Sequence, residues 1–356
     1  MSPYDLSQEQ LRDFLGDLPA YRARQVWHGL YDKGLRPEEM TDLPRDLRER
    51  LAERLPPALV LGEESRSRDG QTVKWLWSGG IETVLMLYPD RATVCVSSQA
   101  GCAMNCSFCA TGQAGFMRHL SAGEIVEQVV HARRVALPRR LSNVVFMGMG
   151  EPLANYDQVW AAVERINDDL GVSARHITLS TVGLIPGIRR LSGEARPVNL
   201  AVSLHAADNE KRNRLVPINR RYPLDALMEA CRQYLTAKGR RLSFEWALIS
   251  NVNDAPDDAR KLASLALPLG AHVNLIPLNP TPGYHVKGTD ARGVRAFRSE
   301  LERLGVNATV RRNRGTDIDA ACGQLAAAAL RRNAEERRSG EVKKAVPAAK
   351  SPQVPD

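Results

Sequence analysis

The stretch Gly101-Cys-Ala-Met-Asn-Cys-Ser-Phe-Cys109 brings three cysteines, Cys102, Cys106 and Cys109, into eight residues with the spacing C-x-x-x-C-x-x-C. Three thiolates at this spacing can all bind one inorganic centre. Cysteines that only pack in a core do not need this spacing. A structural zinc site takes a fourth ligand, and no second cysteine pair or histidine pair lies close by. A four-iron cluster takes one cysteine per iron. The motif therefore predicts a cluster with one iron left open to a substrate.

The chain on both sides of this motif alternates between strand-like and helical patterns. The strand-like segments lie at Val94, 143–147, 176–180, 198–203, 243–249 and 272–278, and the helical ones near 121–136, 155–168, 184–192, 223–238, 256–266 and 290–304. Six β/α units in series predict a parallel sheet with right-handed crossovers. We expect an α/β fold in which this sheet curls into an open, partial (β/α)6 barrel, not the closed eight-unit one.

Four regions are expected along the chain. Residues 1–57 form a small helical accessory domain, with helices at 9–15, 22–33 and 44–55. Residues 58–98 form a short β-rich connection, and 99–335 form the barrel with a further strand at 306–310 and an Ala-rich helix at 319–332. Residues 336–356 are rich in Pro, Ala and Lys and are expected to be a disordered tail.

Composition limits the compartment and the partners. No run approaches the roughly 18 apolar residues of a membrane span, and a secretion signal is lacking, so we expect a cytoplasmic protein without a membrane partner. Six cysteines in 356 residues are too few for a disulfide scaffold, which agrees with a reducing compartment. The net charge of +8 favours a polyanion as partner.

The cysteine motif, with the aromatic Phe108 before its last cysteine, resembles that of the radical S-adenosylmethionine (SAM) superfamily. Within that superfamily, five stretches spread over roughly residues 20–332 resemble the RlmN/Cfr family of RNA adenosine methyltransferases. They are 91–102 (RATVCVSSQAGC), 147–152 (MGMGEP), 203–205 (SLH), 274–280 (NLIPLNP) and 314–325 (RGTDIDAACGQL).

This resemblance implies two cofactors, a [4Fe-4S] cluster and S-adenosyl-L-methionine, which binds the open iron and is cleaved to a 5′-deoxyadenosyl radical. It implies methylation of C2 of an adenosine in large-subunit (23S) rRNA and of an anticodon-loop adenosine in tRNA. It also implies an electron donor of flavodoxin or ferredoxin type, and we expect a monomer. Two alternatives stay open: methylation at C8, and a non-enzymatic iron–sulfur RNA-binding module.

Two further cysteines, Cys95 and Cys322, lie outside the motif. An isolated cysteine is most often a buried small hydrophobe, and Cys231 on an apolar helical stripe fits that interpretation. Cys322 instead lies between an acidic turn and Gly323, and Cys95 lies in the strand that leads into the motif. The resemblance implies that Cys322 is methylated to carry the methyl group and that Cys95 resolves the product.

The chemistry of the base explains why two thiols are needed. C2 of adenine lies between two ring nitrogens and is too electron-poor to attack the methyl group of SAM. A radical on the methyl carried by Cys322 can add to C2 instead. After loss of an electron and of the C2 proton, Cys95 attacks the Cys322 sulfur, which leaves a disulfide and methylated RNA.

Glu82 interrupts an otherwise apolar strand at 81–88. It is either a solvent-facing edge carboxylate or, as the resemblance implies, a proton acceptor, a role that suits a buried carboxylate.

The predicted SAM contacts lie at the ends of successive strands, which on a β/α barrel share one rim with the cysteine loop. They are Gly150, Glu151, Ser180, Ser203, Leu204, His205 and Asn279, and the family's contacts match all of them. The stretch 148–152 also follows a strand as a dinucleotide loop does, but it lacks the third glycine of that fingerprint.

Arginines near the same rim are the candidates for RNA phosphates: Arg212, Arg214, Arg312 and Arg314. A single basic residue more often lies on a solvated face, but these four are better candidates than the basic pairs on the outer helices. Aromatic residues make up 5% of the chain, which disfavours stacking along a continuous single strand and favours capture of one unstacked adenosine. The N-terminal domain is either an RNA-docking module or a packing module around Trp27.

Overall fold

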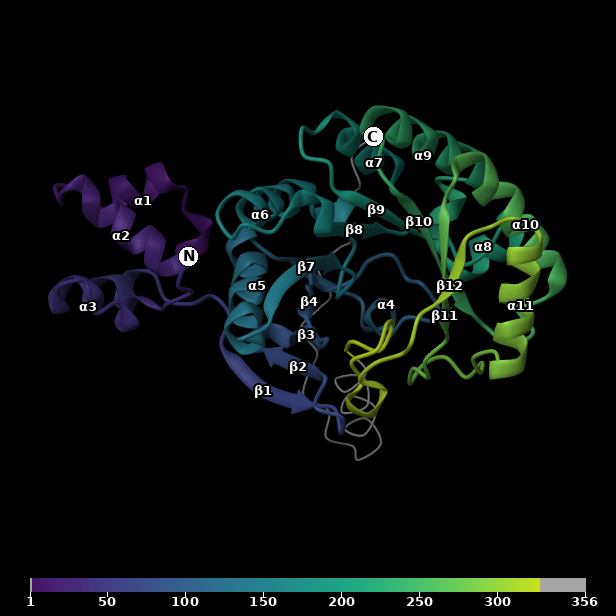
Figure 1. Ribbon diagram of the computed structural model, residues 1–356, viewed down its shortest axis with the longest axis horizontal. Helices are drawn as coiled ribbons and strands as arrows, with labels where there is room; N and C mark the ends of the chain where they lie inside the picture. Colours follow the sequence, from purple (N-terminus) through teal and green to yellow (C-terminus); the bar gives the residue numbers. More distant parts are fainter. Residues whose placement is uncertain (1, 327–356) are drawn as a thin grey trace.

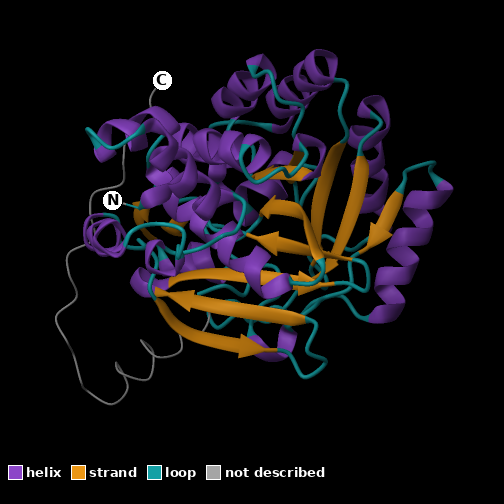
Figure 2. Ribbon diagram, turned by 60° about the vertical axis from the view of Figure 1, so that its left-hand side comes forward, coloured by secondary structure: helices purple, strands orange, loops and turns teal. Residues whose placement is uncertain are grey.

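The structure, a computed structural model, describes residues 2–326, so the expected tail at 336–356 lies outside it. One ten-stranded sheet has the strand order β1-β2-β3-β4-β7-β8-β9-β10-β11-β12, and β5 and β6 form a separate pair. The strands are β1 Leu61–Arg66, β2 Thr72–Trp77, β3 Ile81–Leu87, β4 Arg91–Cys95, β5 Gln99–Gly101, β6 Phe116–His119, β7 Arg140–Phe146, β8 Ile177–Thr181, β9 Asn199–Ser203, β10 Leu242–Leu248, β11 His272–Pro277 and β12 Ala308–Val310. Figures 1 and 2 show the long sheet curving, with helices along its outer side.

The parallel part of the sheet runs from β4 through β7 to β12. The helices are α1 Gln8–Leu15, α2 Ala20–Tyr31, α3 Arg45–Arg54, α4 Ala110–Ala114, α5 Ala122–Ala136, α6 Tyr156–Asp168, α7 Ile185–Gly193, α8 Asn209–Leu215, α9 Leu224–Lys238, α10 Pro256–Ala266 and α11 Ala291–Arg303. The edges of the sheet, β1 and β12, do not pair with each other, so the expected open partial barrel is confirmed. No helix among the described residues is long and apolar enough to cross a membrane.

The residue pattern of a parallel strand explains how polar groups reach the inside of the barrel. In β8, Ile177 and Leu179 are buried, whereas Thr178 and Ser180 on the other face are half-buried. Successive side chains of a strand point to opposite faces. The apolar residues therefore pack against the helices, and Ser180 is free to line the interior.

The N-terminal helices are fixed to α5 and α6 by buried polar contacts. Glu127 of α5 accepts hydrogen bonds from the Ser2 hydroxyl and from two main-chain N–H groups of the linker at residues 58–59, at 2.5, 3.0 and 2.9 Å. The Arg165 guanidinium of α6 donates to main-chain carbonyls of residues 4–6. Trp27 stacks on Tyr31 with ring centroids 4.3 Å apart. These contacts make the domain one packed unit with the barrel.

The strands β1, β2 and β3 extend the barrel sheet with antiparallel pairing. We did not predict β1, because its exposed sequence LGEESR lacks apolar alternation. One face of the extension carries buried residues such as Trp75 and Leu85 of the main core. The other face packs Val84 of β3 against Ala320 and Leu325 near the C-terminal end.

The helix expected from Asp319 is not formed over residues 319–326, and its remainder at 327–332 lies outside the described residues. A short 3-10 helix, Thr316–Ile318, is followed by turns. Asp319 and Gly323 have left-handed φ values of +52° and +82°, which an α-helix cannot accommodate. The Ala-rich composition favours a helix, but tertiary hydrogen bonds to this segment override that propensity.

Candidate active site

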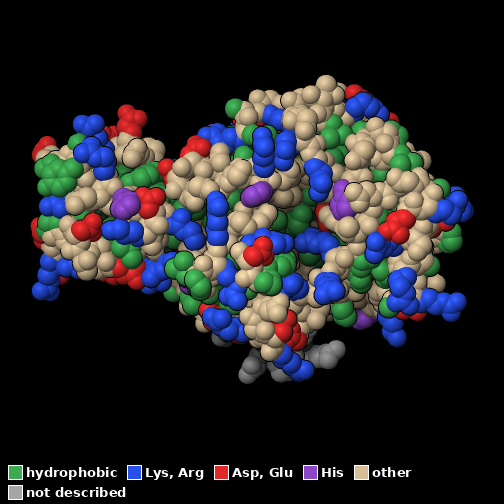
Figure 3. All heavy atoms as spheres, in the orientation of Figure 1, with side chains coloured by type: hydrophobic (Ala, Val, Ile, Leu, Met, Phe, Trp, Pro, Cys, Tyr) green, Lys and Arg blue, Asp and Glu red, His purple; other side chains and the backbone are tan. Residues whose placement is uncertain are grey.

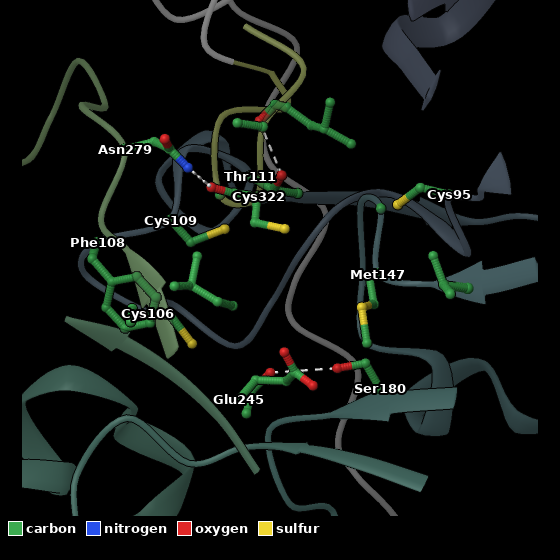
Figure 4. Close-up of a pocket in the computed structure, with 18 of the residues that line it drawn as sticks. Cys95, Cys106, Phe108, Cys109, Thr111, Met147, Ser180, Glu245, Asn279 and Cys322 are labelled. Carbon is green, nitrogen blue, oxygen red and sulfur yellow. Dashed lines mark hydrogen bonds between the residues drawn. The ribbon is translucent and has the colours of Figure 1, made fainter. Parts of the chain in front are cut away.

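A cavity of about 210 Å³ lies at the carboxyl ends of the parallel strands. It is lined by all five cysteines that were predicted to act in the site: Cys95, Cys102, Cys106, Cys109 and Cys322. It is also lined by six of the seven predicted SAM contacts: Gly150, Glu151, Ser180, Ser203, His205 and Asn279. Figure 4 shows Cys106, Cys109 and Cys322 grouped on one side of this space and Cys95 with Met147 on another. Residues far apart in the chain converge here because the strand ends share one rim.

The cluster loop, residues 101–115, is shaped by a close approach of its own two ends. Gly101 has a φ of +76°, and a Cβ there would lie 1.8 Å from the carbonyl oxygen of Gly115. The N–H of Cys102 donates to that same oxygen at 2.8 Å, and the N–H of Cys109 donates to the Cys106 carbonyl at 3.1 Å. Only glycine fits at position 101, so the loop depends on it.

The donor set of the loop fits an iron–sulfur cluster. Burial raises the pKa of Cys102 to about 12 and also raises the pKa values of Cys106 and Cys109. Thiolates form at such a buried place only beside a compensating positive charge, which iron ions supply. Within residues 2–326, no three Cys, His, Asp or Glu side chains converge as ligands of a single ion. A four-iron cluster instead distributes its thiolates over separate irons.

The cavity wall formed by the ends of β7, β8 and β9 is polar. The buried carboxylate of Glu151 accepts the N–H groups of Leu153 at 3.0 Å and Val182 at 2.9 Å, and burial raises its pKa to about 7. The hydroxyl oxygens of Ser180 and Ser203 lie 3.4 Å apart. Glu151 thus ties neighbouring strand ends together, and the serines leave hydroxyl groups facing the cavity.

His205 presents one ring nitrogen to the cavity in a defined protonation state. It has a left-handed φ of +59°, and burial together with the nearby Arg212 lowers its pKa to about 3. The N–H of Ala247 donates to its Nδ1 at 3.0 Å, so the hydrogen of the neutral ring is on Nε2. The ring packs edge-on against Phe108 at 4.7 Å. His205 can therefore donate one hydrogen bond to a bound ligand.

Burial corrects the prediction for Arg212, whereas a contact between SAM and the main chain of Leu204 stays a prediction. The Leu204 side chain is fully buried and does not line the cavity. Arg212 is also fully buried, and its guanidinium donates to the carbonyls of Leu204 at 3.0 Å and Val182 at 2.7 Å and to the Asn219 side chain at 2.8 Å. Its N–H groups donate to these internal acceptors, so Arg212 holds neighbouring parts of the chain together and does not contact a phosphate.

The Cys322 segment, residues 315–326, accepts hydrogen bonds from three donors, of which two lie in the cluster loop and the third, Asn279, follows β11. The Ala110 N–H, the Thr111 hydroxyl and the Asn279 side-chain amide each donate to a main-chain carbonyl of the segment, at 2.9, 3.0 and 3.1 Å. The last of these carbonyls belongs to Cys322 itself, as Figure 4 shows. The predicted SAM contact Asn279 therefore also positions the exposed Cys322.

The β extension holds the same segment from another side. Glu82 Oε2 accepts the N–H of Ala326 at 3.0 Å, and Lys74 Nζ donates to the Asp319 carbonyl at 3.5 Å. Glu82 is only 3% exposed, so the interpretation as a solvent-facing edge carboxylate is wrong. Glu82 does not line the cavity itself; its near neighbour Val84 does.

Two residues that we did not predict complete this part of the cavity: Arg311, which lies near both isolated cysteines, and its partner Glu245. An Arg311 guanidinium nitrogen is 3.4 Å from Glu245 Oε2, and both residues line the cavity. Burial raises the pKa of Cys95 to about 12, and Arg311 opposes that shift. Glu245 interrupts the apolar strand β10 as Glu82 interrupts β3, and the same signal could have found it. Cys95 and Cys322 are both free thiols, and Cys231 is fully buried as expected.

The remaining candidate arginines differ in their relation to the cavity. Arg312 and Arg314 line it, and the Arg314 guanidinium packs 4.5 Å from the ring centroid of Tyr88. Arg214 is exposed on α8 and does not line it. The face shown in Figure 3 is hollowed near its centre, and Lys and Arg side chains border the hollow. A polyanion approaching this opening would meet positive charge.

Comparisons with known proteins agree with this site. The chain matches family models of the radical SAM superfamily over residues 96–263 and of the ribosomal RNA large subunit methyltransferase N-terminal domain over residues 4–56. A probable dual-specificity RNA methyltransferase RlmN of Parafrankia sp. (strain EAN1pec) is 51% identical, covering 91% of each chain. Its counterpart in Salinispora tropica is 51% identical, covering 92% of this chain and 93% of the relative.

A solved structure shares the fold. The crystal structure of a radical SAM methyltransferase from Sphaerobacter thermophilus is 48% identical, covers 92% of this chain and 99% of its own, and superimposes with a TM-score of 0.89. With this identity, the three-cysteine loop and the cavity at the strand ends, the chain belongs to the RlmN family of radical SAM methyltransferases.

Proposed function

We propose that the protein methylates C2 of a specific adenosine in 23S rRNA and of an anticodon-loop adenosine in tRNA, with Cys322 as the methyl carrier. The relatives' name, dual-specificity RNA methyltransferase, supports RNA substrates. The single observation that carries the proposal is that Cys95, Cys322 and the three cluster cysteines line one cavity. A non-enzymatic RNA-binding module would have no use for the two additional thiols.

The residues that line the cavity offer ligands for both cofactors that the family implies. Cys102, Cys106 and Cys109 would ligate the [4Fe-4S] cluster, and the polar wall of Glu151, Ser180, Ser203 and His205 would bind SAM. Together the two cofactors would supply the methyl group and the one-electron chemistry. The Nε2–H of His205 and the serine hydroxyls offer hydrogen bonds to a polar ligand, and the cysteine side chains and Phe108 provide apolar surface.

The chain's own residues account for the transfer of the carbon to the base. The Cys322 sulfur carries the methyl group and then joins C2 through a methylene. For this bond to form, the cofactors would remove one hydrogen atom from the methyl group and one electron from the resulting adduct. Glu82 is the candidate acceptor of the C2 proton, and the electron pair of that C–H bond returns to the ring. Cys95 attacks the Cys322 sulfur; the electron pair of the broken S–C bond stays on the carbon, which takes up a proton to become methyl. The two thiols end as a disulfide, so the carbon gains the two electrons that the sulfurs lose.

The position of Arg311 suits the last step. Burial raises the pKa of Cys95 to about 12, so the thiol holds its proton firmly until it attacks. An attacking sulfur reacts as the thiolate. The Arg311 guanidinium, placed near both sulfurs, favours the negative charge as it forms.

Mass analysis of nucleosides tests the proposal. The enzyme, reconstituted anaerobically with iron and sulfide, is incubated with SAM, a reduced flavodoxin and either a 23S rRNA fragment or tRNA. We expect 2-methyladenosine in both RNAs and none with Cys322→Ala. Formation of 8-methyladenosine would move the reaction to the other carbon, and RNA binding without any methylation would overturn the proposal.

A further inference from the structure

The amine of Lys74 is buried, and the reaction proposed for this site does not use it. It lies in the middle of β2 and is 7% exposed. In the β2–β3 register Lys74 pairs with Val84 and Leu76 pairs with Glu82, which makes Lys74 and Glu82 diagonal neighbours on one face. Lys74 Nζ is 3.7 Å from Glu82 Oε1. The two charges therefore lie together on the face of the extension that packs against the Cys322 segment.

The pair contacts the Cys322 segment at two points. Lys74 Nζ donates to the carbonyl of Asp319 at 3.5 Å, and the second oxygen of Glu82 accepts the N–H of Ala326 at 3.0 Å. These contacts lie three residues before and four residues after Cys322. The segment between them packs its apolar residues Ala320 and Leu325 against Val84 and Met149. The amine and the carboxylate thus span the turn that presents the sulfur.

We propose that Lys74 is a positioning residue, which fixes the Glu82 carboxylate and the Asp319 end of the Cys322 segment relative to each other. This inference rests on the proposed function, in which Glu82 takes the C2 proton. A buried carboxylate is stabilised by a paired charge, and removing one partner leaves the other uncompensated. Without the amine, the carboxylate loses both its paired charge and its fixed distance from the segment.

The effect falls on one step of the reaction. After the methylene has joined Cys322 to C2 and the iron–sulfur cluster has taken one electron from the adduct, the C2 proton passes to Glu82 and the C–H electron pair returns to the ring. Only then can the attack of Cys95 release the product. Loss of Lys74 slows the proton transfer, so the covalent protein–RNA species accumulates, while methylation of Cys322 itself continues.

The experiment compares Lys74→Met with Lys74→Arg and with Lys211→Met. Lys211 forms an ion pair with the buried Asp258 outside the cavity, which makes Lys211→Met a matched control for the loss of a lysine–carboxylate pair. Each reconstituted variant is assayed for methyl-Cys322 by peptide mass, for the RNA adduct on denaturing gels, and for kcat and KM with RNA. Where Lys74→Met does not fold, Lys74→Gln takes its place.

For Lys74→Met we expect normal methyl-Cys322, an accumulated adduct, and kcat about tenfold lower with KM changed less than about twofold. Lys74→Arg should recover most of kcat, and Lys211→Met should match the wild type. Normal turnover by Lys74→Met, slow turnover without adduct, or loss of methyl-Cys322 would each overturn the inference. A wild-type enzyme that methylates no adenosine would instead overturn the proposed function.

Discussion

The cluster loop and the Cys322 segment both bring sulfur to the cavity, but they are held in different ways. The cluster loop bonds to itself, through Cys102 and Gly115 and through the short sheet of β5 and β6. The Cys322 segment is bonded by residues distant in the chain, among them Glu82 and Thr111. The first loop carries its shape in a short stretch of sequence, whereas the second takes its shape from the surface against which it packs.

This difference suits the two roles. Ligands of a cluster must stay at fixed positions, and a locally closed loop provides that. In the proposed reaction, the sulfur of Cys322 receives a methyl group, joins the base and accepts the attack of Cys95. A segment held by several separate contacts, each worth about 1 kcal/mol, can release some of them without unfolding the barrel.

The largest effect is expected from a change that breaks the local loop. Gly101→Val places a side chain where a Cβ would lie 1.8 Å from the Gly115 carbonyl oxygen, at a φ of +76°. We expect iron per chain after reconstitution to fall from about four to below about one. Gly70→Ala is the control, because Gly70 also has a positive φ but no atom within 4 Å of its Cβ position. An unchanged iron content in Gly101→Val would show that the loop binds the cluster without the close approach of Gly101 to Gly115.

The next largest effect is expected from Cys95→Ala, which tests whether the sulfur of the Cys322 segment carries the methylene to the base. Cys95→Ala should methylate Cys322 and join it to RNA, and then stall, because no thiol remains to attack the sulfur. The adduct should appear on denaturing gels and in the mass of the peptide that contains Cys322. The double variant with Cys322→Ala should form none. Normal turnover by Cys95→Ala would mean that this residue only packs in its strand.

A smaller effect is expected from the arginines that precede the Cys322 segment. Changing Arg312 and Arg314 together to Ala should lower the slope of log affinity against log salt by about one for each phosphate that is no longer bound. Fluorescence anisotropy with a tRNA anticodon stem-loop measures the slope. Arg214→Ala serves as the comparison, because Arg214 is exposed but does not line the cavity. A slope that changes only with Arg214→Ala would place the RNA on the α8 side.

The smallest effect should come from one peripheral hydrogen bond of the Cys322 segment. The Asp317 carboxylate accepts the N–H of Arg68 at 2.9 Å in an exposed turn. Asp317→Ala should weaken local protection of residues 315–326 by about 0.5–1 kcal/mol in hydrogen exchange and leave the iron content unchanged. A loss of iron would show that the hydrogen bonds from Ala110 and Thr111 to the Cys322 segment also help to hold the cluster loop in place.

The sequence predicted the barrel well because strand and helix periodicity is repeated six times, and each unit is a local signal. Cys95 and Cys322 were predicted as catalytic thiols through family resemblance, and both line one cavity in the structure. The errors share a cause. Arg212 is polar and near the rim in sequence, but its donors are used by internal carbonyls. The Ala-rich stretch after Asp319 favours a helix, yet its main-chain groups bond to other elements.

By itself the sequence determined the cluster motif, the order of strands and helices and the rim on which the site lies, because spacing and periodicity act over a few residues. Only the tertiary structure decided which carboxylates and cations surround the two isolated cysteines. Glu82, Lys74, Glu245 and Arg311 come from separate parts of the chain, and their contacts depend on sheet register and strand order. Such long-range pairings leave no local pattern, so they appear only when the chain is folded.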